Sequence, residues 1–271
     1  MRSMMRLLIF ILAVLVSVQG VYAWSGKGHA MIGYVADANL TPKARRMCNK
    51  YLEGSLSSHA SWLDKVRYTK EYHHTARWHS VGVRGEELVP SQLTGSKARY
   101  DTPMQQNDHG VARLEELMEQ MKDYRNLSDS AVVVNLKTII HIVGDLHCPG
   151  HTFFADKSMQ YKIKVNGKSC AFHNFIDGAY NRFNEGVTYA DFYEQNCNLT
   201  KAEKRRLSKG DAESWLRDYF PIYRECYELL PVGGEYNDLT EVQQLRLKEM
   251  TNRLYVEAGI RLAHIINEIF K

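Results

Sequence analysis

The sequence predicts a mainly α-helical fold in a single domain with one small β-hairpin. Apolar residues recur at helical spacing along most of the chain, no repeat or linker-like stretch divides it, and only one segment has the pattern of paired strands. The 271 residues are 44% hydrophobic and 24% charged, which allows a sizeable core and excludes compositional disorder. The formal charge of +4 is too small to identify a nucleic-acid binder by composition.

Residues 1–23 have the features of a secretory signal peptide. Two arginines precede the apolar run 7–18, and Val21-Tyr22-Ala23 is typical of a signal-peptidase site. The run is shorter than the roughly 20 residues that span a bilayer, so we expect cleavage and a secreted or periplasmic mature domain, residues 24–271. No later segment is apolar enough to cross a membrane, so no stable membrane association is expected. The five cysteines could pair in an oxidising compartment, but their spacing does not identify partners.

Four helices are expected in the first half of the mature chain. The segment 29–39 has helical spacing, and Thr41-Pro42 reads as an N-cap and first residue of a helix that continues to about residue 54. Apolar residues form one stripe along 108–124. The segment 130–146 is more apolar, as expected of a central helix, and Pro149-Gly150 ends it.

The β-hairpin is predicted at 161–172. Two short runs with strand character flank Asn166-Gly167, a dipeptide that favours a type I′ turn. From residue 189 onward the spacing is helical again, ending in a long amphipathic segment at 239–270.

Two His-x3-Asp pairs carry the clearest chemical signal. His141 and Asp145 are four residues apart on the predicted central helix, so both project from one face, and His173 and Asp177 repeat this spacing. Imidazole nitrogen and carboxylate oxygen both bind zinc, and burying Asp145 in an apolar helix requires a compensating cation. The alternative is that Asp145 pairs with a buried arginine and His141 is a hydrogen-bonded core histidine.

Nine candidate residues follow one order along the chain. They lie in Trp24-Ser-Gly-Lys-Gly-His29, Ala60-Ser-Trp-Leu-Asp64-Lys-Val-Arg67, Trp78-His79, His141-x3-Asp145-x5-His151 and His173-x3-Asp177. This order resembles the S1/P1 family of zinc-dependent single-strand nucleases and 3′-nucleotidases, whose three-zinc site is similar to that of bacterial zinc-dependent phospholipase C. The resemblance runs from residue 24 to about 177, and the helical remainder is compatible with the family's single, mostly helical domain.

The resemblance implies three zinc ions per chain. The first would be bound by the α-amine and carbonyl oxygen of Trp24, with His29 and a bridging carboxylate from Asp145. The second would be bound by Asp64, His79, His141 and Asp145, and the third by His151, His173 and Asp177. Because only the first residue of a chain has an α-amine, cleavage after Ala23 would create the Trp24 ligand.

The activity implied by the resemblance is hydrolysis of phosphodiester bonds in single-stranded RNA or DNA, with 3′-nucleotides as a further substrate class. Clustered zinc ions would lower the pKa of water and neutralise phosphoryl and leaving oxygens. Asp64 would orient or deprotonate the water, and Arg67 would bind phosphate in a bidentate manner; a solvated surface arginine is the alternative for Arg67. No obligate protein partner is inferred.

Two other functions fit the same residues. One is a phospholipase C-like enzyme or another phosphomonoesterase that uses the same metals, and the other is a non-catalytic zinc-binding helical protein with an incomplete site. The chain also departs from the family pattern near the proposed pocket: Ser80 and Gly82 replace residues associated with base recognition, and Cys148 stands where the family commonly has glutamine. A thiolate at Cys148 would be a good zinc ligand, but a buried or disulfide-bonded cysteine is the more common arrangement.

Overall fold

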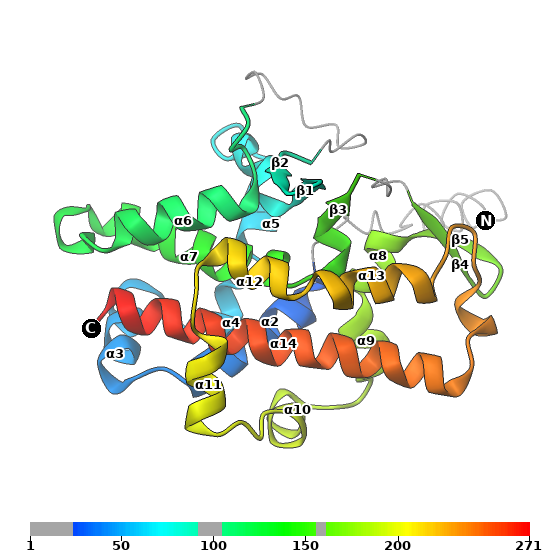
Figure 1. The fold of residues 1–271 in the computed structure, drawn as a ribbon. Helices are drawn as coiled ribbons and strands as arrows, with labels where there is room; N and C mark the ends of the chain where they lie inside the picture. Colours follow the sequence, from blue (N-terminus) through cyan, green and yellow to red (C-terminus); the bar gives the residue numbers. More distant parts are fainter. Residues whose placement is uncertain (1–23, 92–104, 156–160) are drawn as a thin grey trace, which may run out of the picture.

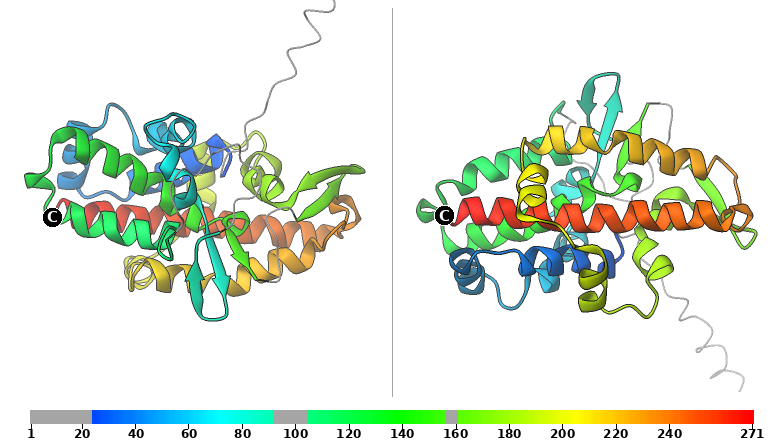
Figure 2. Two further views of the ribbon diagram at one scale, coloured as in Figure 1. Left: turned by 90° about the horizontal axis from the view of Figure 1, so that it is seen from above. Right: turned by 60° about the horizontal axis from the view of Figure 1, so that its bottom comes forward.

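The longest helix, α14 (Glu241–Ile269), runs along most of the molecule (Figure 1). The computed structural model describes residues 24–91, 105–155 and 161–271. Thr240 begins the helix with a capping box, in which its hydroxyl accepts from the Gln243 N–H and the Gln243 side chain bonds back to the Thr240 N–H. Figure 2 shows α14 between α12 and α13 (Ala212–Asp218 and Phe220–Leu229) on one side and α2 (Gly26–Ala38) on the other.

Helix α2 packs directly against α14 because Gly259 allows a close approach. A Cβ added at Gly259 would lie only 2.4 Å from the Cβ of Val35 and 2.9 Å from the carbonyl oxygen of Ile32. Any larger residue would push the two helices apart or strain their packing. This contact fixes the position of α2, which carries His29.

Helix α7 (Asp129–Leu146) is the central helix that the apolar spacing predicts. The Ser128 hydroxyl caps its first turn by accepting from the Ala131 N–H. Residues 138–146 are all buried, so the second half of the helix is covered on every side. Pro149 follows the last turn and cannot continue the helix. A helix buried in this way holds its functional side chains in fixed positions.

The prediction of a mainly α fold is confirmed. The other predicted helices are present with small shifts at their ends: α2, α3 (Pro42–Tyr51), α6 (Gly110–Met121) and α14. The remaining helical segments are α4 (Leu56–His59), α5 (Trp62–Val66), η1 (His73–His79), η2 (Tyr124–Asn126), η3 (Pro149–His151), α8 (Phe172–Asp177), α9 (Ala179–Phe183), α10 (Tyr189–Asn196), α11 (Lys201–Leu207) and η4 (Tyr236–Asp238).

The predicted hairpin is formed by β4 (Lys162–Val165) and β5 (Lys168–Ala171), which pair antiparallel. Asn166 and Gly167 both have positive φ, 52° and 73°, as a type I′ turn requires. The side chain of Glu235 accepts from the N–H groups of both turn residues, at 3.0 and 2.8 Å. The turn is therefore held by η4 as well as by its own sequence.

A second, three-stranded sheet was not expected. It has the order β2-β1-β3, in which β1 (Val81–Arg84) pairs antiparallel with β2 (Glu87–Val89) and parallel with β3 (Thr152–Phe154). Strands of three or four residues show too little alternation to be recognised, and the β1–β3 pair joins segments about 70 residues apart. The expectation of a single β element is therefore wrong.

All five cysteines lie within the described residues, and each is a free thiol. The possibility of disulfide pairing is therefore not realised in this structure. Four of the thiols are buried, where they act as small apolar groups. Among the described helices, none combines the length and apolar character that a membrane span requires.

Candidate metal centre

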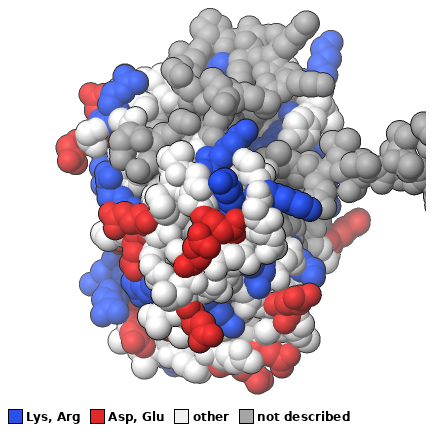
Figure 3. Space-filling model, turned by 90° about the vertical axis from the view of Figure 1, so that its right-hand side faces the viewer, with Lys and Arg blue, Asp and Glu red and all other residues white. Residues whose placement is uncertain are grey.

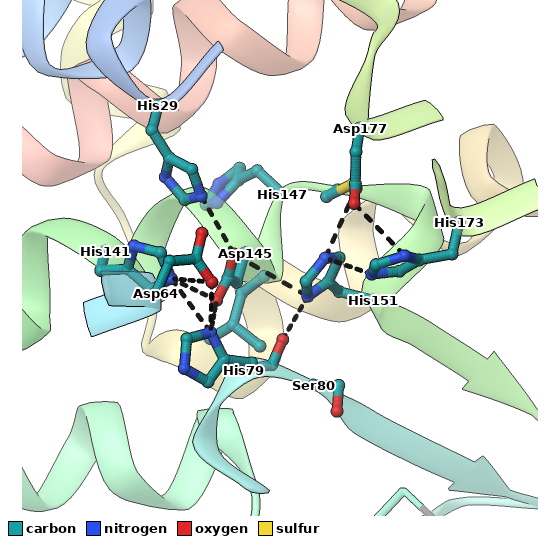
Figure 4. Close-up of polar contacts among 12 residues, drawn as sticks. His29, Asp64, His79, Ser80, His141, Asp145, His147, His151, His173 and Asp177 are labelled. Atoms are coloured by element: carbon teal, nitrogen blue, oxygen red, sulfur yellow. Dashed lines mark hydrogen bonds and ion pairs between the residues drawn. The ribbon is translucent and has the colours of Figure 1, made fainter. Parts of the chain in front are cut away.

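Helix α7 supplies the middle of the site. The side chains of His141 and Asp145 are fully buried, with His141 Nε2 3.1 Å from Asp145 Oδ2 (Figure 4). His141 Nδ1 lies 2.7 Å from the carbonyl oxygen of Ala60. A proton on Nδ1 donates to that carbonyl and leaves the Nε2 lone pair directed toward the carboxylate cluster.

The first group of ligand atoms comes from His29, His141 and Asp145, whose atoms lie within 4.8 Å of one another. His29 Nε2 is 3.3 Å from Asp145 Oδ1, and its ring stacks on that of His141 at 4.2 Å. A Cβ at Gly144 would lie 2.6 Å from His29 Nδ1, so glycine is needed there for the ring to enter. Both ring nitrogens of His29 are buried and have no hydrogen-bond partner.

The second group consists of Asp64 from α5, His79 from η1 and His141, again within 4.8 Å. His79 Nδ1 is 2.9 Å from Asp145 Oδ2 and 3.7 Å from Asp64 Oδ1. His141 Nε2 is 3.0 Å from His79 Nδ1 and 3.8 Å from Asp64 Oδ1. Asp145 therefore faces two groups, one with each carboxylate oxygen.

The third group lies beyond Asp145, between η3 and α8. His151 Nε2 is 3.5 Å from Asp177 Oδ1 and 3.0 Å from His173 Nε2, while His173 Nδ1 is 3.3 Å from Asp177 Oδ2. His151 Nδ1 contacts the carbonyl oxygen of His79, which orients its Nε2 toward Asp177 (Figure 4). His173 reaches His151 and Asp177 through different ring nitrogens. Cys148 Sγ lies 3.4 Å from Asp177 Oδ1, and Cys148, His151 and Asp177 form a set whose ligand atoms are all within 4.8 Å of one another.

The three groups fit a metal such as zinc. Two nitrogen or oxygen ligands on one tetrahedral zinc ion lie about 3.3 Å apart, given bond lengths of roughly 2.0–2.1 Å. The closest pairs of candidate ligand atoms in this site lie 2.9 to 3.8 Å apart. Both carboxylate oxygens of Asp64, both of Asp145 and one of Asp177 are buried without a hydrogen-bond donor. Buried carboxylates in this state are costly unless a cation compensates them.

The surroundings of the cluster shift the pKa values of two of its histidines in opposite directions. Burial, followed by the nearby charge of Arg67, lowers the pKa of His79 to about 4, so this imidazole is neutral and able to bind a metal. Burial also acts on His151, but the carboxylates of Asp145 and Asp177 outweigh it and raise the pKa to about 9. A metal ion must therefore displace a proton from His151 when it binds.

Trp24 is fully buried beside the cluster. Its ring lies 4.3 Å from that of Tyr255, and the Ser25 N–H donates to the Asp177 carbonyl at 2.6 Å. The start of the described chain is therefore tied to the segment that carries the third group. Residues 1–23, where we expect the signal peptide, lie outside the described residues.

Arg67 lies beside the second group. Its Nη2 is 3.4 Å from Asp64 Oδ1 and donates to the Tyr68 hydroxyl at 3.1 Å. With 12% of its side chain exposed, it is less accessible than a solvated surface arginine. A partly buried guanidinium at the edge of a carboxylate cluster is suited to bind an oxyanion.

The structure brings together all eight side-chain candidates for metal ligation and adds features that have no sequence pattern. The backbone carbonyls of Ala60 and His79 orient two of the imidazoles, and Gly144 makes room for a third. Cys148, by contrast, had a sequence signal, because it stands where the family commonly has glutamine. His147, one residue earlier, points away from the groups and contacts Arg261 instead.

Comparison with known proteins agrees with this geometry. Residues 24–271 match the family described as S1/P1 nuclease. Nuclease P1 from Penicillium citrinum is 26% identical over 277 aligned positions, covering 91% of this chain and 97% of that protein. Nuclease S1 from Aspergillus oryzae is 24% identical over 234 positions, covering 78% of this chain and 74% of that protein. Endonuclease 1 from Arabidopsis thaliana is 22% identical over 310 positions, covering 99% of this chain and 94% of that protein.

Proposed function

The chain belongs to the S1/P1 nuclease family and is a hydrolase of phosphodiester bonds, and on that premise we propose that it cleaves single-stranded RNA or DNA with three bound zinc ions. The observation that carries the proposal is the set of buried carboxylate oxygens without hydrogen-bond donors, surrounded by imidazoles at metal-ligand spacing. We include 3′-nucleotides as a further substrate class.

The proposed ligands divide among three ions. Trp24, His29 and Asp145 would hold the first, Asp64, His79, His141 and Asp145 the second, and His151, His173 and Asp177 the third. When bound, clustered zinc ions lower the pKa of a water molecule and neutralise charge on the phosphoryl and leaving oxygens. The hydrogen bonds from His141 to Ala60 and from His151 to His79 keep these two rings in the orientation that ligation requires.

Two side chains would act directly on the substrate. Asp64 has no hydrogen-bond donor on either oxygen, so one oxygen is available to orient the attacking water and accept its proton. Arg67, 3.4 Å from Asp64, would bind the phosphate through its guanidinium and hold phosphorus close to that water. Arg67 and the bound zinc ions would thus compensate the negative charge of the phosphate within the site. On the face in Figure 3, basic and acidic side chains lie side by side, in keeping with the modest net charge.

A substrate panel tests the function. The zinc-loaded chain beginning at Trp24 is assayed on single- and double-stranded RNA and DNA, on a 3′-nucleotide and on phosphatidylcholine. We expect the single-stranded polymers to be cleaved faster than the duplexes. Turnover of the lipid alone would contradict the proposal and favour the phospholipase C-like alternative.

Arg67→Met should lower kcat/KM for the single-stranded substrate by roughly 10- to 100-fold, the value of one charge-assisted hydrogen-bonding group. Lys65→Met is the matched control, because Lys65 is an exposed cation on α5, the short helix whose C-cap is Arg67. Equal losses in the two variants would indicate a general effect of charge and would contradict the phosphate-binding role of Arg67.

We also propose that residues 1–23 are removed on export and that the mature enzyme is secreted or periplasmic. The family match begins at residue 24, which supports a mature chain that starts at Trp24. If the α-amine is a ligand, one additional residue before Trp24 should lower zinc content and activity together. Full zinc content and activity in such a chain would contradict the α-amine assignment.

A further inference from the structure

The third group contains a sulfur atom among its nitrogen and oxygen atoms. Cys148 follows α7 directly, is fully buried, and lies with His151 and Asp177 in a set whose ligand atoms are all within 4.8 Å of one another. The thiol sulfur is 3.4 Å from Asp177 Oδ1. Cys148 is therefore part of the cluster and not simply a neighbour of it.

The position of Sγ fits shared coordination. A sulfur and an oxygen on one tetrahedral zinc ion, with bonds of roughly 2.3 and 2.0 Å, lie about 3.5 Å apart. The observed separation is 3.4 Å. The separation of His151 Nε2 and Asp177 Oδ1, at 3.5 Å, suits the same ion. One metal position can therefore be reached by all three side chains.

A thiol that served only as a hydrogen-bond donor would leave the group incomplete. Donation to Asp177 Oδ1 satisfies one carboxylate oxygen, but Oδ2 is buried and has no hydrogen-bond partner. His173 Nδ1 lies 3.3 Å from this oxygen but contacts the Asn174 side chain instead. Asp177 is only 4% exposed, so bulk solvent does not supply the missing donor. A cation within the group would compensate both oxygens.

We propose that Cys148 Sγ is a fourth protein ligand of the metal held by His151, His173 and Asp177, an inference that rests on the proposed metal centre. Binding would replace the thiol proton, which leaves to solvent. Two imidazoles, one carboxylate and one thiolate neutralise a divalent ion and complete a tetrahedral shell. The thiolate then selects zinc over hard cations such as Mg²⁺ at this position.

Cobalt substitution tests this assignment by absorption, independently of activity. The metal-free full-length mature chain is reloaded with Co²⁺, whose bond to a thiolate gives a near-ultraviolet charge-transfer band in addition to the visible bands of tetrahedral cobalt. We expect the charge-transfer band in the wild-type protein, its loss in Cys148→Ser, and its retention in Cys170→Ser. Cys170 is a suitable control because it is a half-buried thiol on the neighbouring strand β5.

The outcomes separate the two proposals. Two results would overturn the role of Cys148 and leave the metal centre intact. One is a wild-type spectrum with visible cobalt bands but no charge-transfer band, and the other is a charge-transfer band that persists in Cys148→Ser. Absence of all cobalt bands would overturn both. The wild-type spectrum is informative even if the variant folds poorly. As a second readout, Cys148→Ser should lose one zinc ion per chain to a chelator at least about tenfold faster than Cys170→Ser; equal rates would contradict the assignment.

Discussion

Two buried clusters lie on different sides of the C-terminal end of α7, and they satisfy their polar atoms in different ways. In the Arg261 cluster (Arg261, His147 and Trp215), the buried guanidinium donates to the Trp215 carbonyl and lies 3.2 Å from His147 Nε2; on its solvent side it lies 3.2 Å from Oδ2 of the exposed Asp218. In the metal centre, Asp64 and Asp145 have four buried oxygens without a donor. Protein atoms alone complete the first cluster but not the second.

The difference shows that burial of charge does not by itself indicate a site. His141 and His147 are both buried at the same end of one helix. His147 donates from Nδ1 to the Val143 carbonyl at 2.7 Å and accepts from Arg261, so both its nitrogens are used within the protein. The imidazoles around Asp145 instead point lone pairs at carboxylates that need a cation. Unsatisfied atoms, more than buried ones, mark the functional region.

The largest expected effect comes from Asp145→Asn. This change removes the negative charge from the side chain shared by the first two groups, so we expect loss of at least one zinc ion per chain and a fall in kcat of roughly 10²- to 10³-fold. Elemental analysis and turnover of a single-stranded substrate measure these quantities. Normal zinc content in a folded Asp145→Asn protein would contradict the claim that the carboxylates of this cluster, unlike the Arg261 cluster, require a cation.

Arg261→Met tests the other cluster. The Leu207 and Trp215 carbonyls and His147 Nε2 would lose their donor, so we expect the free energy of unfolding to fall by about 2–4 kcal/mol, as measured by denaturant titration. Zinc content per folded chain should be unchanged. A metal loss as large as that in Asp145→Asn would show that the clusters are not independent.

Gly144→Ala sharpens the comparison within the metal centre. The added methyl group would lie 2.6 Å from His29 Nδ1 and displace that ring, so the affinity for one zinc ion should fall about 10- to 100-fold in a competition titration with a chelator. Gly26→Ala is the control, because its new Cβ would come no closer than 3.6 Å to Ser61 Oγ. Similar affinities in both variants would argue against His29 as a ligand.

The smallest effect concerns acid stability. Burial, followed by the charge of Arg261, lowers the pKa of His147 to about 3, below its ordinary value of 6.5. Below pH 6.5 the unfolded chain binds a proton here that the folded chain does not, so this site should reduce stability by about 2 kcal/mol between pH 7 and pH 5.

His147→Gln should therefore show a weaker loss of stability than the wild-type protein over the same pH interval. Unfolding titrations of both proteins in the same zinc-containing buffer measure the difference, since metal release contributes to both. Identical pH profiles would contradict a neutral, buried His147.

Much of the fold follows from local pattern. Helical spacing and the proline after the last turn predict α7 within one residue of its start, and Asn166-Gly167 predicts the hairpin because both residues adopt positive φ. The sheet β2-β1-β3 was not predictable in this way. Its parallel pair depends on the packing of η1 and η3 against α7, which brings residues 81–83 beside 152–154.

For the site, the sequence predicts which residues are ligands but not the contacts that position them. The spacing of His141 and Asp145 indicates one shared helix face, and family resemblance supplies the partners from other segments. No sequence pattern reveals that the carbonyls of Ala60 and His79 orient the rings, or that Gly144 admits His29, since these are contacts between distant segments. The buried-arginine alternative for Asp145 also needed the structure, because Arg261 pairs with His147 instead.

The number of zinc ions bound to the folded chain tests the central claim most directly. The protein beginning at Trp24 is loaded with zinc, dialysed against metal-free buffer and analysed for metal and protein in the same sample. The three groups around Asp145 and Asp177 predict three zinc ions per chain. Fewer than two ions in a folded, monodisperse sample would contradict the assignment of these unsatisfied carboxylates and imidazoles to a metal centre.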